Sequence, residues 1–264
     1  MIVHDDDGVR PVDLARAAEI FHLVAGPIHA RRGHLVECTA QIGTGRSVVA
    51  AGRSRSRLVL RGTLPVDTVH YAWTVIIPLM TAADCILFSG GAPGAEAAFG
   101  AAAERHGVEE VHFTFDGHKI ERSRGVRVLN HKELLAGDVS LQYVSRLMHR
   151  RYTEGPTLRK ILQTLWYQVN NGQEIYVIGS IQADGTVRGG TGWGAEFAKL
   201  CNKPLFVFDQ DRDAWSRWTG DDWENIDANA APVVTHMHFT GTGTRTLRAN
   251  GQKAIEDLFR RSFS

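Results

Sequence analysis

The sequence has 264 residues, of which 43% are hydrophobic and 22% charged, a composition typical of an ordinary globular protein. Its 30 basic and 29 acidic residues give a net charge of +1, so the chain as a whole lacks the strong positive charge of a typical nucleic-acid-binding protein. Apolar stretches such as 75–79 and 85–88 are too short to span a bilayer, and no membrane partner is expected.

The first ten residues and the cysteines bear on the compartment. The opening MIVHDDDGVR carries three aspartates and no apolar run, which argues against a secretory signal. The three cysteines, Cys38, Cys85 and Cys201, are odd in number and far apart, so no disulfide framework is expected. A reducing compartment suits such a chain, and we expect a cytoplasmic protein.

Residues 1–79 show no pattern that indicates a function. Residues 11–31 fit an amphipathic helix, because their apolar residues recur at spacings of three and four. Residues 34–77 read as several short strands. Three interpretations of this part stay open: a small β-rich appendage, a dimerisation element and a poorly specified extension. We expect it to be separate from a second domain over 80–264.

From residue 80 onward, short apolar runs alternate with helical patterns. The expected strands are 83–88, 108–115, 174–180, 203–210 and 233–240. The expected helices are 95–107, most of 131–171 with a break at 153–157, 193–202 and 246–261. The segment 211–226 holds three tryptophans and fits a hairpin or a lid. This alternation predicts a Rossmann-like α/β fold with a mainly parallel sheet and helices on both faces.

Three expected strands end in glycine-rich turns that lead into helices. These turns are Ser89–Gly94 (SGGAPG), Gly189–Gly192 (GGTG) and Gly241–Thr244 (GTGT). A helix N-terminus presents unpaired N–H groups and partial positive charge, and glycine lets a phosphate approach that backbone closely. Because the carboxyl ends of parallel strands share one edge of the sheet, we expect the three loops to meet at a single ligand site. The alternative is that these glycines only make tight turns.

The loops resemble signatures of the SLOG superfamily, which includes the Lonely Guy phosphoribohydrolases and the DNA-processing protein A family. SGGAPGAE at 89–96 resembles SGGAxGxD, with Glu96 in place of the aspartate. GGTGWGAE at 189–196 is similar to GGxGTxxE, with Trp193 in place of the threonine. The stretch 239–259 looks like the first strand, loop and helix of that superfamily, which would make this domain circularly permuted. A second, truncated copy is the rival explanation.

The resemblance implies that a nucleotide or nucleotide derivative binds at the three loops. It also implies that Glu196 helps to hydrolyse the N-glycosidic bond of this ligand, with Arg151 steadying the phosphate or the ribose. The residues predicted to bind the ligand are Ser89, Gly90, Gly91, Gly94, Glu96, Gly189, Gly190, Thr191, Gly192, Gly241, Thr242, Gly243 and Arg245. Two alternatives stay open: a non-catalytic sensor of nucleotide signals, and a DNA-binding module related to DNA-processing protein A.

Other partners and metals receive less support from the sequence. Nucleic acid is not favoured as a partner because the net charge is near zero. His236 and His238 alternate along an expected strand, but their spacing implies no third ligand, so no metal site is predicted. We expect no cofactor, and a homodimer as the oligomeric state.

Overall fold

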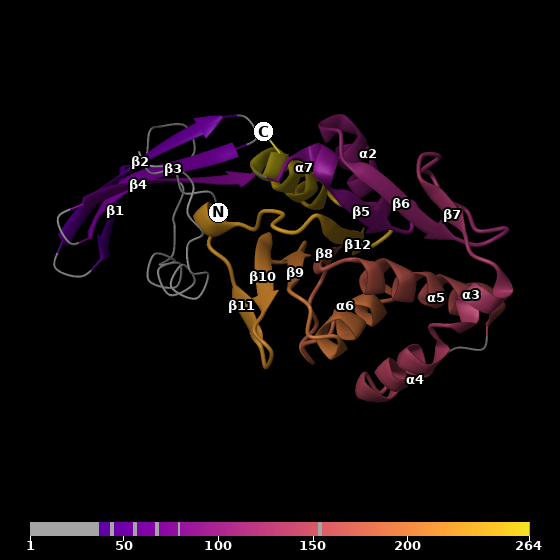
Figure 1. Cartoon of the computed structure of the whole chain (residues 1–264). Helices are drawn as coiled ribbons and strands as arrows, with labels where there is room; N and C mark the ends of the chain where they lie inside the picture. Colours follow the sequence, from indigo (N-terminus) through magenta and orange to yellow (C-terminus); the bar gives the residue numbers. More distant parts are fainter. Residues whose placement is uncertain are drawn as a thin grey trace. The chain divides into compact units, whose positions relative to one another are not determined.

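The structure is a computed structural model. It describes the backbone of residues 37–42, 45–54, 57–66 and 69–78, and residues 80–152 and 155–263 in full. The chain divides into two compact units, Met1–Met80 and Thr81–Ser264. The described strands of the first unit form one antiparallel sheet, in the order β1 (Glu37–Ile42), β2 (Gly45–Ser54), β3 (Arg57–Val66) and β4 (Val69–Pro78) (Figure 1). The helix expected over 11–31 lies outside the described residues.

The second unit is built on an eight-stranded sheet with the order β11-β10-β9-β8-β12-β5-β6-β7. Its strands are β5 (Ile86–Ser89), β6 (Glu109–Thr114), β7 (Val126–Val128), β8 (Glu174–Gly179), β9 (Leu205–Asp209), β10 (Ala214–Trp218), β11 (Trp223–Asn225) and β12 (His238–Gly243). The six strands from β9 to β7 are parallel, and the β10–β11 hairpin extends the sheet in antiparallel pairing. The predicted mainly parallel α/β fold is confirmed.

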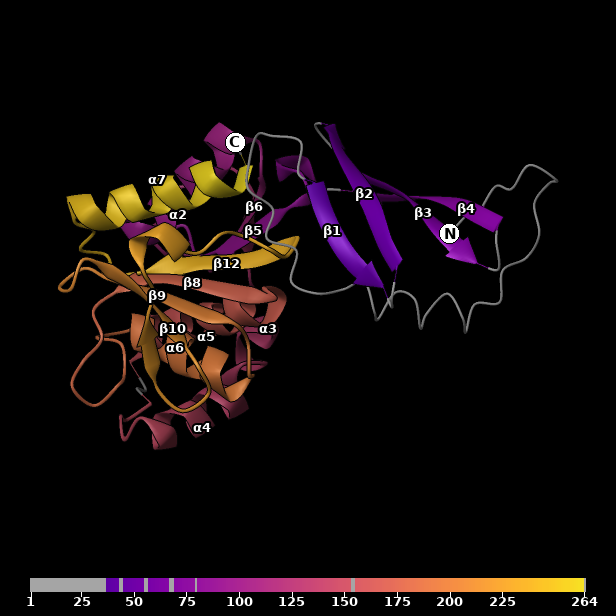
Figure 2. The ribbon, with the colours of Figure 1, turned by 90° about the vertical axis from the view of Figure 1, so that its left-hand side faces the viewer.

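Helices cover both faces of this sheet, as predicted (Figure 2). On one face lie α2 (Ala95–His106) and α7 (Ala249–Phe263), which pack against each other. On the other face lie α3 (His131–Leu135), α4 (Asp138–Leu147), α5 (Pro156–Asn171) and α6 (Thr191–Leu200). Two short 3₁₀ turns complete the described elements, η1 (Ala82–Asp84) and η2 (Ala228–Ala230). Because it has helices on both sides, β8 is buried along its whole length.

The third glycine stretch is strand rather than turn, which corrects the expected boundaries. The predicted strand 233–240 begins only at His238, and it continues through Gly243. A Cβ on Gly241 would lie 2.5 Å from the Phe99 ring, and a Cβ on Gly243 would lie 2.4 Å from the carbonyl oxygen of Ile178. These two glycines are therefore explained by close packing inside the sheet region, where a side chain has no room.

The last strand of the chain, β12, lies in the middle of the sheet between β8 and β5. From β5 the chain continues outward to β6 and β7, and from β8 it continues outward in the opposite direction to β9, β10 and β11. Connections that diverge in this way leave a crevice outside the carboxyl ends of the central strands. The topology thus favours a ligand site where β5, β8 and β12 end.

Candidate functional site

A cavity of about 500 Å³ lies at this edge of the sheet, and all three glycine-containing loops line it. The first loop contributes Ala92 and Glu96, the second Gly189–Thr191, and the third Thr242–Thr246. The other lining residues are His118, Leu158, Ile161, Thr164, Leu165, Gln168, Gly179, Ser180, Arg188, Gln210 and Arg248. The structure therefore brings the three loops together around one space.

At the first loop, the carboxylate of Glu96 accepts hydrogen bonds from the loop backbone and from β12. Its Oε2 accepts a hydrogen bond from the backbone N–H of Ala92 at 3.1 Å, and its Oε1 accepts one from the hydroxyl of Thr242 at 3.0 Å. The N–H of Ala95, at the start of α2, donates to the carbonyl of Thr244 at 3.0 Å. The side chain is almost fully buried, and this burial raises the pKa of Glu96.

Four other predicted residues of the first loop do not line the cavity. Ser89 is fully buried, and its hydroxyl has no hydrogen-bond partner among the described residues. A Cβ on Gly90 would lie 2.5 Å from Oε2 of Glu96, and Gly91 packs against the ring of His112. Gly94 has φ of 94°, and a Cβ there would lie 2.5 Å from the carbonyl oxygen of Arg245. The structure thus shows these glycines in close-packed positions.

The second loop presents a free helix N-terminus. Gly189 and Gly190 are exposed, and a Cβ on either would meet nothing within 4 Å. The backbone N–H groups of Gly190 and Thr191, where α6 begins, donate to no acceptor among the described residues. Arg188 is exposed beside them, and its side chain forms no hydrogen bond within the described part of the chain. This end of the cavity can therefore accept an anion.

Arg150 fixes the second loop through several hydrogen bonds. Its guanidinium donates to Oε1 of Gln182 at 2.8 Å and to the hydroxyl of Thr186 at 2.7 Å. It also donates to the carbonyl of Val187 at 3.3 Å, against which Gly192 packs so closely that a Cβ would lie 2.1 Å from that oxygen. Gly192 therefore does not line the cavity. Its neighbour in sequence, Arg151, is exposed and does not line the cavity either.

Glu196 is not among the residues that line the cavity. Its carboxylate pairs with the ammonium of Lys199 at 2.8 Å, and that ammonium lies 3.8 Å from the ring centre of Trp218 and 4.8 Å from that of Trp223. Each helical residue turns by about 100°, so Glu196 is rotated about 140° from Thr191, which lines the cavity. The catalytic roles of Glu196 and Arg151 stay predictions, and no contact with this cavity supports them.

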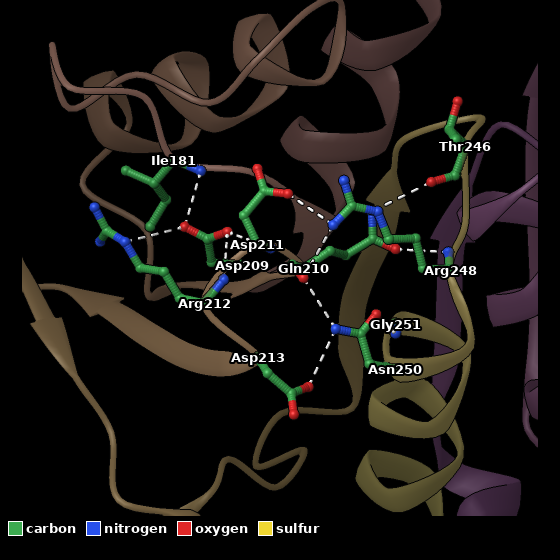
Figure 3. Close-up of polar contacts among 10 residues, drawn as sticks. All are labelled: Ile181, Asp209, Gln210, Asp211, Arg212, Asp213, Thr246, Arg248, Asn250 and Gly251. Carbon is green, nitrogen blue, oxygen red and sulfur yellow. Dashed lines mark hydrogen bonds and ion pairs between the residues drawn. The ribbon is translucent and has the colours of Figure 1, made fainter.

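The third loop is tied to the end of β9 by Gln210 (Figure 3). The side-chain oxygen of Gln210 accepts a hydrogen bond from the N–H of Arg248 at 2.8 Å, and its amide donates to the carbonyl of Thr246 at 3.2 Å. Arg248 also pairs with Asp211 at 2.7 Å. Arg245, in contrast, is exposed, and its side chain makes no hydrogen bond with a described residue. Its charge is thus available to a ligand.

His118 adds a neutral polar group to the wall. The ring stacks on Phe115 with centroids 4.7 Å apart, and its Nδ1 lies 3.1 Å from the hydroxyl of Thr114. Burial, followed by the charge of Arg245, lowers the pKa of His118. Nε2 has no partner among the described residues, so the neutral ring keeps an unused polar atom.

Sequence reasoning missed several lining residues. Arg188 had a usable signal, because it directly precedes GGTG just as Arg245 directly follows GTGT. Gln168 had no such signal, because it lies in the middle of α5, in a stretch with no motif.

Among the described residues, no group of three or more His, Cys, Asp or Glu side chains could hold a metal ion. None of the described helices is long and apolar enough to cross a membrane.

Comparisons with known proteins add little. No family model matches the chain, and no curated protein matches it. One solved structure is similar, a "putative molybdenum carrier protein" from Syntrophus aciditrophicus SB, with 15% sequence identity and a TM-score of 0.39. The similarity covers 66% of this chain and 92% of that one. A likeness at this level supports no inference about the ligand of this chain.

Proposed function

We propose that the cavity binds a small molecule of the nucleotide class and holds its phosphate at the N-terminus of α6. The observation that carries this proposal is the meeting of three loops around one cavity whose charged lining is predominantly cationic. Arg188, Arg245 and Arg248 line it, with Arg248 paired to Asp211, and Glu96 is the one carboxylate among its lining residues. Such an excess of positive charge favours an anionic ligand.

The phosphate position follows from the groups that the protein leaves unused. The N–H groups of Gly190 and Thr191 have no acceptor among the described residues, whereas those of Ala92 and Ala95 in the first loop are already bonded. A phosphate at α6 would gain these N–H groups and the guanidinium of Arg188. The first loop then supports Glu96 and does not itself hold phosphate.

The rest of the cavity suits an organic body. Leu158, Ile161 and Leu165 of α5 contribute apolar side chains to the lining. A volume of about 500 Å³ lies within the range of small-molecule sites. A ligand with a charged phosphate at one end and a flat, largely apolar ring system at the other would match both parts of the lining.

If the cavity also catalyses a reaction, we propose that Glu96 supplies the acid–base group. This carboxyl lines the cavity, and burial raises its pKa, a combination that is frequent at catalytic sites. Hydrolysis of the N-glycosidic bond is therefore a second candidate function, in which Glu96 would face the sugar in place of Glu196 and would not contact the ring of the base.

Thermal unfolding with a ligand panel tests the binding proposal. AMP, GMP and CMP should raise the melting temperature, because a ligand that binds only the folded state stabilises it, and adenosine should raise it far less. Arg188→Gln should weaken monophosphate binding by about tenfold or more, as expected for the loss of a charged hydrogen bond. Arg217, exposed on the β10–β11 hairpin and outside the cavity lining, provides the control variant Arg217→Gln.

Two results would contradict the proposal. The first is a melting temperature that no phosphate-bearing compound moves. The second is an equal loss of affinity in Arg188→Gln and Arg217→Gln, which would indicate a general effect of charge rather than a site at α6.

A further inference from the structure

Two buried side chains meet at the cavity from opposite faces of the sheet. Glu96 comes from α2 and is 8% exposed, whereas Gln168 comes from α5 and is 1% exposed. The amide of Gln168 lies beside the carboxylate of Glu96 and partly offsets the rise in its pKa. Gly90 packs against both, because a Cβ there would lie 2.5 Å from Oε2 of Glu96 and 2.6 Å from Nε2 of Gln168.

Hydrogen-bond acceptors dominate this part of the lining. The side-chain oxygen of Gln168 has no partner among the described residues. The hydroxyl of Thr242 already donates to Glu96, and that of Thr164 donates to the carbonyl of Ile161 at 2.7 Å. Both hydroxyl hydrogens therefore already take part in hydrogen bonds, whereas the side-chain oxygen of Gln168 has no donor in the described part of the chain. A buried carbonyl without a donor is unfavourable, and a ligand that supplies the donor removes this penalty.

We propose that Gln168 is a specificity-determining residue whose amide oxygen, together with Glu96, accepts hydrogen bonds from an amino group on the ring of the ligand. The preferred ligands are then monophosphates of amino-substituted bases rather than of bases that lack the amino group. This inference rests on the proposed function, because the phosphate at α6 orients the ring toward α5.

The charge distribution agrees with this assignment. Burial raises the pKa of Glu96, and the hydrogen bonds from Ala92 and Thr242 together with the attraction of Arg245 offset this only in part. An N–H group of the ligand that donates to the carboxyl of Glu96 would compensate for the hydration that this carboxyl lost on burial. A carbonyl oxygen attached to the ring of the ligand at the same place would instead face the acceptor atoms of Gln168 and Glu96, which is unfavourable.

Calorimetric titration of the full-length protein tests the inference with matched ligand pairs. AMP should bind about tenfold or more tightly than purine riboside monophosphate, which differs only in lacking the amino group, because the unmade bond leaves the protein acceptor unpaired. CMP should likewise bind more tightly than UMP. In Gln168→Met the advantage within each pair should fall to about twofold, while the affinity for the ligands that lack the amino group stays nearly unchanged.

Gln163→Met is the matched control. Gln163 lies on the same helix, is 3% exposed and donates to Asp138 at 2.6 Å, but it does not line the cavity. It should therefore keep the preference of the wild type. Because the ligand pairs are first compared in the wild type, the inference can be tested even if Gln168→Met folds poorly.

The outcomes separate the two proposals. Equal affinity within both pairs in the wild type would overturn this inference and leave the phosphate site standing. A preference that survives in Gln168→Met would overturn the role of Gln168. If no monophosphate binds at all, both the proposed function and this inference fall.

Discussion

The hydroxyl of Thr242 donates a hydrogen bond to the carboxylate of Glu96 at 3.0 Å, although the two residues are 146 positions apart in the chain. This bond joins the end of β12 to the first turn of α2, and the backbone bond from Ala95 to Thr244 reinforces it. Two of the three glycine loops are thereby held as one unit, with a buried carboxyl at their junction.

Stability should depend on pH through Glu96. Burial raises its pKa above the ordinary 4.5, so the folded protein binds this proton more strongly than the unfolded chain does. The stabilising contribution is present below pH 4.5 and is lost as pH rises through the raised pKa. Glu96→Gln cannot ionise, so its free energy of unfolding should improve relative to wild type as pH increases. Urea unfolding across that range measures the difference, and a constant difference would contradict the prediction.

Gly190→Asp should abolish the stabilisation by phosphate-bearing ligands, because it places a carboxylate where the phosphate is proposed to bind. The substitution is structurally mild: Gly190 has φ of −63°, and a Cβ there meets nothing within 4 Å. Gly190→Ala is the control and should keep both the melting temperature and the ligand response. Thermal unfolding with and without AMP distinguishes them, and an undiminished AMP response in Gly190→Asp would rule out the α6 site.

Arg150→Met should destabilise the protein and weaken ligand binding without removing a ligand contact. Arg150 holds the 182–189 loop through Gln182 and Thr186, and loss of these charged hydrogen bonds should cost about 2 kcal/mol. Hydrogen exchange of the loop amides should accelerate, since the loop opens more easily. Arg151→Met, at the exposed neighbouring position, should change neither quantity. Equal effects of the two substitutions would show that Arg150 has no special role.

Glu196→Gln should lower the free energy of unfolding by about 1 kcal/mol, because it removes the charge that pairs with Lys199 in a partly exposed position. Affinity for AMP should stay unchanged, since Glu196 does not line the cavity. Calorimetry measures the affinity, and release of free base from AMP measures any turnover. Turnover in the wild type that disappears in Glu196→Gln but persists in Glu96→Gln would restore the catalytic role predicted from the motif.

The sequence by itself determined most of the order of strands and helices in the second unit, because this information is local, but it did not predict β7. Buried strands such as β8 are short apolar runs, and their ends are marked by glycines. The positions of the first two glycine loops, and the edge of the sheet at which they lie, follow from the alternation of strand and helix, whereas the third glycine stretch is mostly strand. The helix expected over 193–202 was predictable for the same reason, although α6 begins two residues earlier, at Thr191.

Only the tertiary structure decided which side chains face the cavity. Tertiary packing decides which face of α6 lies toward the cavity. Glu196 lies on a face where it pairs with Lys199 and does not line the cavity, and the spacing of residues in the sequence does not specify this orientation. Gln168 lies beside Glu96 because α2 and α5 pack on opposite faces of the same strands, β5 and β12, which is a long-range packing result. Gly241 and Gly243 read locally as a turn, yet parallel pairing with Tyr176 and Ile178 of β8 makes them part of a strand. Local patterns specify elements, whereas the surroundings of a side chain depend on contacts between residues that are distant in the chain.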